Sequence, residues 1–397
     1  MRILFVHERF GACGGAESNI LATAIELGAR GNAVGILHGP STGKGEAAWR
    51  DAFPFRRPFQ KGQSFSETRE LFQPDVIYVH KLSETKLLEQ LLDSEIPVVR
   101  MVHDHDLYCM RSYKYNYFTR HICERPLSSF CIIPCGSSIG RDRDGGFPLK
   151  WVSYTAKTRE LELNRRFHRL IVASQYMKGE LLRNRFNSSQ IELHPPVPPT
   201  VDTSCQSSFS NRNLIIYSGQ IVRGKGVDVL LESLARVKVP FSCLIFGDGA
   251  HREACEKHSR KLGLADRVIF KGFVAPEEIT AFYREASVAV VSSVWPEPFG
   301  AVGLEAMRFG LPVVAFDAGG IREWLANGQN GFLVPWMDRG LFAVRVEELL
   351  RDKVLAREMG DRGRKLMTGQ FAFSKYVTGL ENLFSRVASQ PSLAIST

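Results

Sequence analysis

Two carboxylates in the stretch 287–310, SVAVVSSVWPEPFGAVGLEAMRFG, have the spacing of a ligand-binding pair. They are Glu297 and Glu305, with seven residues between them. Residues 288–291 predict a buried strand, and a helix is expected to begin near Gly300. The first amides of a helix lack partners within it and lie at its positive end, where they bind anions. Because carboxylates accept hydrogen bonds from hydroxyl groups, the pattern favours a ligand with both phosphate and hydroxyl groups, such as a nucleotide sugar.

Lys225 places a positive charge in a similar setting. It lies in the loop 218–226, SGQIVRGKG, between a strand expected at 213–217 and a helix expected at 227–235. A lysine on a glycine-rich loop just before a helix is well placed to bind a diphosphate. The ordinary alternative is an exposed surface lysine, and for the two glutamates it is an exposed loop residue and a solvated helix face.

Strands and helices alternate along the chain in two series, which predicts two parallel sheets with helices on their faces. The first series has expected strands at 2–6, 33–37, 76–79, 98–102 and 170–173. The second has expected strands at 213–217, 242–246, 268–270, 288–291 and 312–316. Residues 194–213 are rich in proline and then in serine, which is typical of a linker. The predicted domains therefore span 1–195 and 213–370, with a linker at 196–212.

A glycine turn, GACGGAES, connects the strand at 2–6 to a helix expected at 16–29. It offers a second anion site, but it lacks the G-x-G-x-x-G spacing, and no acidic residue follows where an adenosine ribose would be held. A dinucleotide site is therefore disfavoured. A tight strand-to-helix turn with no ligand is the alternative interpretation.

The segment 297–306, EPFGAVGLEA, resembles the E-x7-E signature of retaining glycosyltransferases of family four. The resemblance implies the GT-B fold, an α/β architecture of two Rossmann-like domains whose parallel sheets face each other across a cleft. It implies that Glu297 lies against the donor sugar and that Glu305 holds the ribose hydroxyls. It also implies that a C-terminal helix, here 371–390, crosses back to the N-terminal domain, which is the acceptor side. The amides expected on the donor sugar and phosphate are those of Phe299, Gly300 and Ala301.

Two other segments extend the resemblance to the donor phosphates and base. The loop 218–226 resembles the family's G-R-x-x-x-x-K-G loop, so Lys225 is expected on the pyrophosphate. The arginine position of that loop is Gln220 here, a departure that leaves either Arg223 or Lys225 alone to stabilise the leaving group. The GGAE turn resembles a glycine loop that closes over the donor phosphates or the acceptor. Further donor-binding positions implied by the resemblance are Gly15, Gly219, Gly247, Phe273 and Val274.

Histidines follow two strands of the first sheet, at the edge where parallel sheets bind ligands. His80 follows the strand at 76–79 and His103 follows the strand at 98–102. The sequence VRMVHDHDLYC resembles the family's HD segment, which favours His103 as the N-terminal group that meets the donor sugar. His80 is a weaker candidate, and His105 is expected to be exposed. The alternative is that each histidine has only a structural role.

Four cysteines cluster in a predicted insertion at about 105–150. Thiolates this close together in a reducing environment commonly hold a structural zinc ion, although the spacing lacks paired C-x-x-C motifs. Redox-active disulfides and unrelated thiols are the alternatives. A branch of the same family carries a similar insertion after its HD segment, which supports a structural role. The four residues are Cys109, Cys123, Cys131 and Cys135.

Charge and hydropathy limit the partners. The formal net charge is +9, with 44% hydrophobic residues and no run of about 18 apolar residues that would span a membrane. No nucleic-acid-binding motif accompanies the charge, so nucleic acid is not expected as a partner. The insertion interleaves aromatic and basic residues, which favours contact with an anionic membrane surface, and a solvated basic face is the alternative. We expect a cytoplasmic protein, peripheral on the inner face of the membrane.

These observations predict a retaining, metal-independent hexosyltransferase for glycan, polysaccharide or glycolipid synthesis. Its donor would be a UDP-, GDP- or ADP-linked sugar, and its acceptor a sugar or a lipid-linked sugar. No cofactor is expected for catalysis, because no D-x-D pair follows an apolar strand, and His103, Glu297 and Lys225 are the expected catalytic residues. Replacing Glu297 or Lys225 by alanine is expected to reduce transfer without unfolding the protein. A nucleotide-sugar epimerase or phosphorylase of the same fold, and a non-catalytic sugar-nucleotide or glycan-binding protein, are the alternatives.

Overall fold

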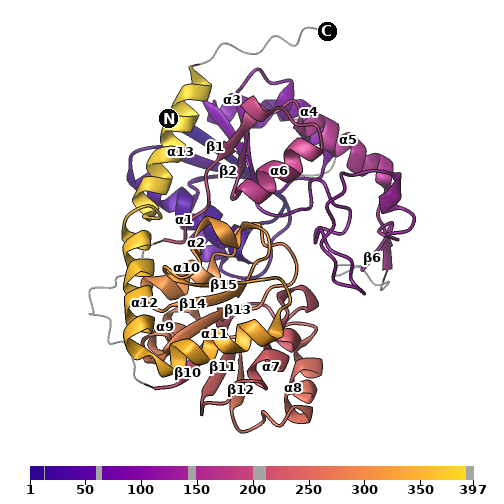
Figure 1. Ribbon diagram of the computed structural model, residues 1–397. Coiled ribbons are helices and arrows are strands. Elements are labelled where there is room, and N and C mark those ends of the chain that lie inside the picture. Colours follow the sequence, from indigo (N-terminus) through magenta and orange to yellow (C-terminus); the bar gives the residue numbers. More distant parts are fainter. Residues whose placement is uncertain (13, 60–64, 142–148, 200–211, 390–397) are drawn as a thin grey trace. The chain divides into compact units, whose positions relative to one another are not determined.

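The computed structural model describes residues 1–12, 14–59, 65–141, 149–199 and 212–389. The chain divides into two compact units, which are described one at a time (Figure 1). Unit 1 comprises Met1–Ser112, Glu124–Pro199 and Phe373–Thr397. Unit 2 comprises Tyr113–Cys123 and Thr200–Ala372. Most of the linker predicted at 196–212 lies outside the described residues.

Unit 1 is built on a seven-stranded sheet in which all paired strands are parallel, in the order β3-β2-β1-β4-β5-β8-β9. Its central strands are runs of apolar residues that are buried on both faces, as parallel sheets between helices require. The strands are β1 (Arg2–His7), β2 (Ala33–His38), β3 (Phe55–Pro58), β4 (Val76–Val79), β5 (Val98–Val102), β8 (Arg169–Val172) and β9 (Ile191–Leu193).

The helices of unit 1 cover this sheet, and one of them comes from the far end of the chain. α13 (Phe373–Ala388) packs with the ring of Phe384 5.0 Å from that of Tyr78 on β4. Its Glu381 accepts a hydrogen bond of 2.9 Å from Arg30 at the end of α1. The other helices are α1 (Gly15–Ala29), α2 (Glu46–Ala52), α3 (Ser66–Phe72), α4 (Thr85–Leu92), α5 (Tyr154–Asn164) and α6 (Gln175–Arg183).

Unit 2 is built on a six-stranded parallel sheet in the order β12-β11-β10-β13-β14-β15. Counted along the chain this is the order 3-2-1-4-5-6 of a Rossmann fold, in which ligands bind where the order reverses. That point lies between β10 and β13. The strands are β10 (Leu214–Ser218), β11 (Ser242–Phe246), β12 (Val268–Gly272), β13 (Val288–Val291), β14 (Val313–Phe316) and β15 (Gly331–Val334).

Helices and one apolar core hold this sheet together. The core joins residues of β10, β11, β13 and β14 to α7 and α11, all of them shielded from solvent. Because both faces are covered, the sheet needs apolar residues along its whole length, which is the pattern that predicted it. The helices are α7 (Val227–Leu234), α8 (Arg252–Lys261), α9 (Pro276–Glu285), α10 (Val302–Arg308), α11 (Arg339–Arg351) and α12 (Lys353–Thr368).

The cysteine-bearing insertion predicted at about 105–150 is divided between the two units. Residues 113–123 group with unit 2, whereas the rest of the insertion that the structure describes groups with unit 1. The unit 1 part includes an antiparallel pair, β6 (Ile139–Arg141) and β7 (Leu149–Trp151). Assigning the whole insertion to the N-terminal domain was therefore wrong. Within the described ranges, no helix has the length and hydrophobicity needed to span a bilayer.

Candidate active site

Two loops meet at the point where the strand order of unit 2 reverses. One follows β10 and contains Lys225, in a short 3₁₀ helix at Arg223–Lys225, and the other follows β13. The carbonyl of Gly224 accepts hydrogen bonds from the amides of Val294 and Trp295, at 2.9 and 3.0 Å. A Cβ atom at Gly224 would lie 3.0 Å from the Trp295 indole, so glycine allows this close approach. The loops are thereby fixed against each other.

Lys225 and Glu297 face each other across these loops. The Nζ atom of Lys225 lies 2.7 Å from Oε1 of Glu297, and the Glu297 residue is only 4% exposed. The same oxygen accepts hydrogen bonds from the indole of Trp295, at 2.8 Å, and from the hydroxyl of Ser293. Burial raises the pKa of Glu297, but the charge of Lys225 and these hydrogen bonds outweigh it and hold the pKa below its usual value. Glu297 is therefore a buried, ionised carboxylate.

The backbone of Glu297 is held by the loop that follows β14. Its amide donates to Ala318 at 3.1 Å, and its carbonyl accepts from the amide of Gly320 at 2.7 Å. Gly319 has φ +68°, and a Cβ there would lie 2.4 Å from the carbonyl oxygen of Glu297, so only glycine fits. Sequence reasoning identified Glu297 but missed Ser293, Trp295 and this loop, because nothing in their spacing marks them.

Glu305 lies in the first turn of α10, which begins at Val302 rather than near Gly300. Gly300 adopts φ +80°, a conformation that favours glycine. Glu305 is half-buried, and burial raises its pKa, an effect that Arg308 reduces. Glu305 in turn raises the pKa of Tyr283, after the larger effect of burial. Glu305 is thus a partly desolvated carboxylate, whose hydrogen-bonding capacity is well suited to ligand hydroxyls.

The three residues proposed to supply amides next to Glu305 make hydrogen bonds within the protein through their carbonyl groups. Phe299 is buried, and its carbonyl accepts a hydrogen bond of 2.7 Å from the indole of Trp324. The amide of Glu305 bonds to the carbonyl of Ala301 at 3.1 Å, as the helix begins. The structure thus places Phe299, Gly300 and Ala301 on the short connection between the two glutamates.

Two glycines, Gly219 and Gly247, follow the carboxyl ends of β10 and β11. Gly219 (φ +151°) donates its amide to Phe246 at 3.0 Å, and a Cβ on Gly247 (φ +130°) would lie 1.9 Å from the Gly219 carbonyl. Gln220, which replaces the expected arginine, is exposed, and its carbonyl accepts a hydrogen bond from Tyr217 at 3.1 Å. Of the two residues proposed to contact the base, Phe273 is 81% exposed and Val274 is half-buried.

His103 and His80 form a hydrogen-bonded pair in unit 1, at the carboxyl ends of β5 and β4. Nδ1 of His80 lies 2.7 Å from Nε2 of His103, with the rings stacked 5.0 Å apart. Burial, followed by the charge of His7, lowers the pKa of His103 to about 3, and burial lowers that of His80 well below its usual value. Both rings are therefore neutral near pH 7.

The pair has a preferred tautomer. Among the described residues, Nε2 of His80 is buried and has no hydrogen-bond partner. Orphaned buried N–H groups are rarer than orphaned acceptors, so we assign the proton of His80 to Nδ1. His80 then donates to Nε2 of His103, which must carry its own proton on Nδ1. The prediction that His105 is exposed was wrong: it is 1% exposed, and its Nδ1 lies 2.7 Å from the Tyr108 hydroxyl.

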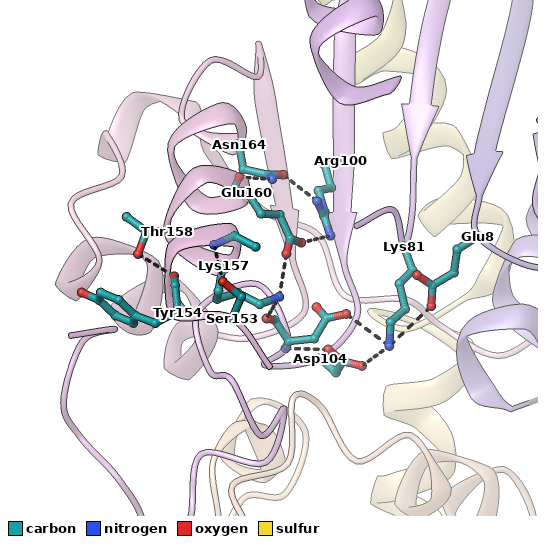
Figure 2. A network of polar contacts seen from close by, with 12 residues as sticks. Glu8, Lys81, Arg100, Asp104, Ser153, Tyr154, Lys157, Thr158, Glu160 and Asn164 are labelled. Carbon is teal, nitrogen blue, oxygen red and sulfur yellow. Dashed lines mark hydrogen bonds and ion pairs between the residues drawn. The ribbon is translucent and has the colours of Figure 1, made fainter. Parts of the chain in front are cut away.

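An ion-pair network holds the segment that follows His103 (Figure 2). Nζ of Lys81 lies 3.2 Å from Asp106, 3.6 Å from Asp104 and 4.0 Å from Glu8. Burial raises the pKa of Asp106, but the charges of Lys81 and Arg100 reverse this effect and lower it. Sequence reasoning missed the network, although Lys81 and Asp104 each lie two residues after the end of neighbouring strands, which was a usable signal.

α5 continues this network on the other side of the segment. Lys157 donates to the carbonyl of Asp106 at 2.9 Å and to Glu160 at 2.6 Å (Figure 2). Arg100, a buried residue of β5, donates to Asn164 at 2.7 Å. Because these charges are paired and hydrogen-bonded, the strand-end segment that carries His103 has a fixed backbone.

Gly15, predicted in the glycine turn, is the first residue of α1. A Cβ at this position would meet nothing within 4 Å, so packing inside the protein does not require glycine. Nearby, Glu17 lies 3.3 Å from Nε2 of His7, and this contact helps to lower the pKa of Glu17 against the opposing effect of burial. Cys13, in the same turn, lies outside the described residues.

The four cysteines proposed as zinc ligands are assigned to different units. Cys123 groups with unit 2, and Cys109, Cys131 and Cys135 group with unit 1. In the part of the chain that the structure describes, no three His, Cys, Asp or Glu side chains are arranged to hold a metal ion. A structural zinc ion at these cysteines therefore stays a prediction.

A cavity of about 690 Å³ in unit 1 lies away from all of these residues. It is lined by parts of α1 and α2 and by the first residues of β2 and β3, including Ala24, Ala33 and Phe55. Ligands of parallel sheets bind at the opposite ends of the strands, so this cavity is not the candidate site.

Comparison with known proteins identifies the part of the chain that contains Lys225, Glu297 and Glu305. Residues 204–366 match the family model described as "Glycosyl transferases group 1". This segment is similar to a glycosyltransferase group 1 domain. The match covers the whole sheet of unit 2 and both loops at its switch point.

Curated relatives agree with the domain match. Lipopolysaccharide core biosynthesis glycosyltransferase LpsE of Rhizobium meliloti is 31% identical over 172 residues, 43% of this chain and 49% of the relative. Putative glycosyltransferase EpsD of Bacillus subtilis is 32% identical over 200 residues, 49% of this chain and 51% of the relative. The chain thus spans about half the length of these relatives.

Solved structures match over nearly the whole chain. Anabaena HepE, crystallised with UDP, has a TM-score of 0.72 at 20% identity and covers 97% of this chain and 100% of its own. Sucrose-phosphate synthase from Thermosynechococcus elongatus has a TM-score of 0.72 at 19% identity, covering 98% and 99%. These similarities confirm the predicted GT-B fold of two Rossmann-like domains. At this level of identity they show the fold alone.

Proposed function

We propose that this protein is a retaining glycosyltransferase that moves a hexose from a nucleoside diphosphate to an acceptor hydroxyl. The observation that carries the proposal is the ion pair between half-buried Lys225 and buried Glu297 at the switch point of unit 2. It lies in the segment that matches the glycosyltransferase group 1 model. HepE, of the same fold, was crystallised with UDP and with UDP-glucose, which supports a nucleotide-sugar donor.

Each residue of the site has a role in this reaction. The bond between the sugar C1 and the diphosphate oxygen breaks, and C1 bonds to the acceptor oxygen on the same face. The acceptor's proton leaves with the diphosphate. Lys225 neutralises charge on the departing diphosphate, a contribution of the kind that often dominates catalysis. Glu297 positions the sugar, and Glu305 accepts hydrogen bonds from the ribose hydroxyls. The reaction needs no metal ion in this proposal.

His103 stays the predicted group of unit 1 that contacts the donor sugar. In the assigned tautomer its Nδ1–H is a hydrogen-bond donor, because Nε2 already accepts from His80. A neutral imidazole donor suits a sugar hydroxyl or its ring oxygen. Gly15 is likewise proposed to lie near the donor phosphates or the acceptor.

An acceptor at an anionic membrane surface is supported by the unit 1 part of the insertion. Four large apolar side chains there are exposed: Phe130 (40%), Ile133 (79%), Ile139 (56%) and Trp151 (74%). Arg125 lies 3.9 Å above the ring of Phe130, which places a positive charge on this apolar surface. Exposed aromatic and basic side chains together are typical of membrane-interface contacts. Co-sedimentation with anionic liposomes should therefore occur and weaken as salt is raised, and binding to neutral liposomes alone would contradict this part.

The experiment that tests the function is incubation with UDP-, GDP- and ADP-linked hexoses and a panel of sugar acceptors. We expect release of one nucleoside diphosphate and a product whose anomeric configuration, read by proton NMR, is that of the donor. An acceptor-independent change in the sugar would favour epimerisation. Saturable donor binding without release or transfer would favour a binding protein. Inversion at C1 would contradict the retaining mechanism.

A further inference from the structure

Residues Tyr113–Cys123, here called the 113–123 hairpin, fold back on themselves within unit 2. Tyr115 and Ile122 form an antiparallel bridge, and Cys123 donates its amide to Lys114 at 2.7 Å. The side chain of Asn116 closes the turn by accepting from the amides of Phe118 and Thr119, both at 2.9 Å. The hairpin is therefore an ordered element with its own hydrogen bonds.

Arg120 ties the hairpin to the start of α7. It is 6% exposed as a residue and forms an ion pair with Asp228, which is in the first turn of α7, three residues after Lys225. Burial raises the pKa of Asp228, but Arg120 more than reverses this effect and lowers it. His251 adds a longer contact to the same carboxylate at 3.7 Å. Because Arg120 is buried, leaving its charge without Asp228 is costly, so the pair favours one arrangement.

Arg223, in the loop 218–226 that also carries Lys225, provides a second attachment for the hairpin. Its Nε donates to the carbonyl of Tyr117 at 2.9 Å, its Nη2 to that of Phe118 at 3.4 Å, and its guanidinium lies 5.2 Å from the ring centre of Tyr117. The residue that could replace the missing arginine at position 220 is thus engaged by the hairpin.

Tyr113 contacts the indole of Trp295, which in turn contacts both Lys225 and Glu297. Its ring centre lies 5.3 Å from that of Trp295. Trp295 donates to Oε1 of Glu297 at 2.8 Å, and Nζ of Lys225 lies 5.2 Å above the same indole. A shift of this indole would therefore move the hydrogen-bond donor of Glu297 and the surface on which Lys225 rests. A second ring contact, of 6.0 Å, joins His121 to Trp336.

We propose that the 113–123 hairpin is a positioning element of the donor site, with Arg120 as its anchor and Tyr113 as the residue that holds Trp295. Arg223 is then a tether for the hairpin, and Lys225 meets the diphosphate without a second cation from this loop. The proposal rests on the proposed function, because it describes how this insertion prepares unit 2 for a nucleoside diphosphate sugar. Arg120, Tyr113 and Arg223 act through other residues and are not catalytic.

The test compares nucleoside diphosphate binding and donor kinetics in three variants of the full-length protein. Arg120→Ala removes the anchor, Tyr113→Ala removes only the ring against Trp295, and Arg120→Asp with Asp228→Arg reverses the ion pair. Arg351→Ala is the matched control, because Arg351 makes an exposed ion pair with Glu347 on α11. UDP, GDP and ADP are titrated calorimetrically, and kcat and KM are measured with the sugar donor that the wild type uses.

We expect Arg120→Ala and Tyr113→Ala each to weaken diphosphate binding by about tenfold, since small misplacements of positioned groups have large effects. The donor KM should rise while the acceptor KM stays unchanged. The reversed pair should recover much of the loss, and Arg351→Ala should show none. Tyr113→Ala should also change the tryptophan fluorescence emission of the protein. This change should be absent when Tyr113→Ala is made in a Trp295→Phe background.

The outcomes separate the two proposals. A wild type that binds none of the three diphosphates contradicts the proposed function. A wild type that binds one, with Arg120→Ala and Tyr113→Ala folded and binding equally well, overturns the positioning role. If Arg120→Ala does not fold, Tyr113→Ala decides, because it leaves the ion pair in place: wild-type binding and donor KM in that variant overturn the proposal.

Discussion

The ammonium group of Lys225 lies 2.7 Å from the carboxylate of Glu297, although 72 positions separate the two residues in the sequence. The loops that carry them follow β10 and β13, the two strands between which the order of the unit 2 sheet reverses. Their meeting is therefore a consequence of the strand order and of the hydrogen bonds between the loops at Gly224. A ligand diphosphate would compete with Glu297 for the Lys225 charge.

The buried pair makes a stability prediction that the sequence did not. Removing either charge leaves the other uncompensated inside the protein, so Lys225→Met and Glu297→Gln should each lower the free energy of unfolding, Lys225→Met by about 3 kcal/mol. From the sequence alone, we expected only that such substitutions would reduce transfer without unfolding the protein. The double variant should be more stable than Lys225→Met, as measured by urea unfolding. Additive losses would show that the two groups do not interact in solution.

Removing the charge of Glu305, unlike that of Lys225 or Glu297, should not lower the free energy of unfolding. Because burial raises its pKa, the folded state disfavours its charged form, and Glu305→Gln should be as stable as the wild type or more stable by about 1 kcal/mol. The same change should weaken nucleotide binding, since an amide replaces one acceptor of the ribose hydroxyls. Thermal unfolding with and without UDP measures both effects. Lower stability together with unchanged UDP binding would contradict this assignment.

The His80–His103 pair predicts that the folded protein becomes less stable in acid. His80 and His103 are neutral when folded, but in the unfolded chain they take up protons below about pH 6.5. The free energy of unfolding should therefore fall as the pH falls from about 6.5 towards 3, and each ring contributes up to about 1.4 kcal/mol per pH unit. Urea unfolding of His80→Phe at several pH values should show a shallower dependence. An identical slope would mean that His80 is not the titrating group.

The tautomer assignment can be observed directly. Nitrogen-15 NMR of labelled histidine should show the proton of His103 on Nδ1 and the proton of His80 on Nδ1 near pH 7. His80→Phe keeps the aromatic stack but removes the hydrogen bond, so His103 should then populate both tautomers. A wild-type His103 that carries its proton on Nε2 would reverse the direction of the hydrogen bond and contradict the assignment.

Strand positions and the residues just after strands could be predicted from the sequence. Runs such as VAVV at 288–291 are apolar because both faces of the sheet are covered, and residues that follow them reach one edge. This is why Lys225, Glu297 and His103 could be placed at that edge before the structure, whereas Glu305 was identified by its spacing from Glu297. The prediction that His105 is exposed was wrong because the turn after β5 buries its ring against Tyr108.

Contacts between distant irregular segments could not be predicted. The hydrogen bond from Trp295 to Glu297 depends on loop conformation, and no periodicity marks it. The 113–123 hairpin joins unit 2 through Arg120 and Asp228, which are 108 positions apart.

The measurement that tests the central claim most directly is calorimetric titration of nucleotide sugars into the wild type and into Lys225→Ala and Glu297→Gln. Lys257→Ala, an exposed lysine on α8, is the matched control. We predict saturable binding of at least one UDP-, GDP- or ADP-linked hexose to the wild type and the control, weakened roughly tenfold or more in the two site variants. No binding by the wild type, or equal binding by all four proteins, would contradict a donor site at Lys225 and Glu297.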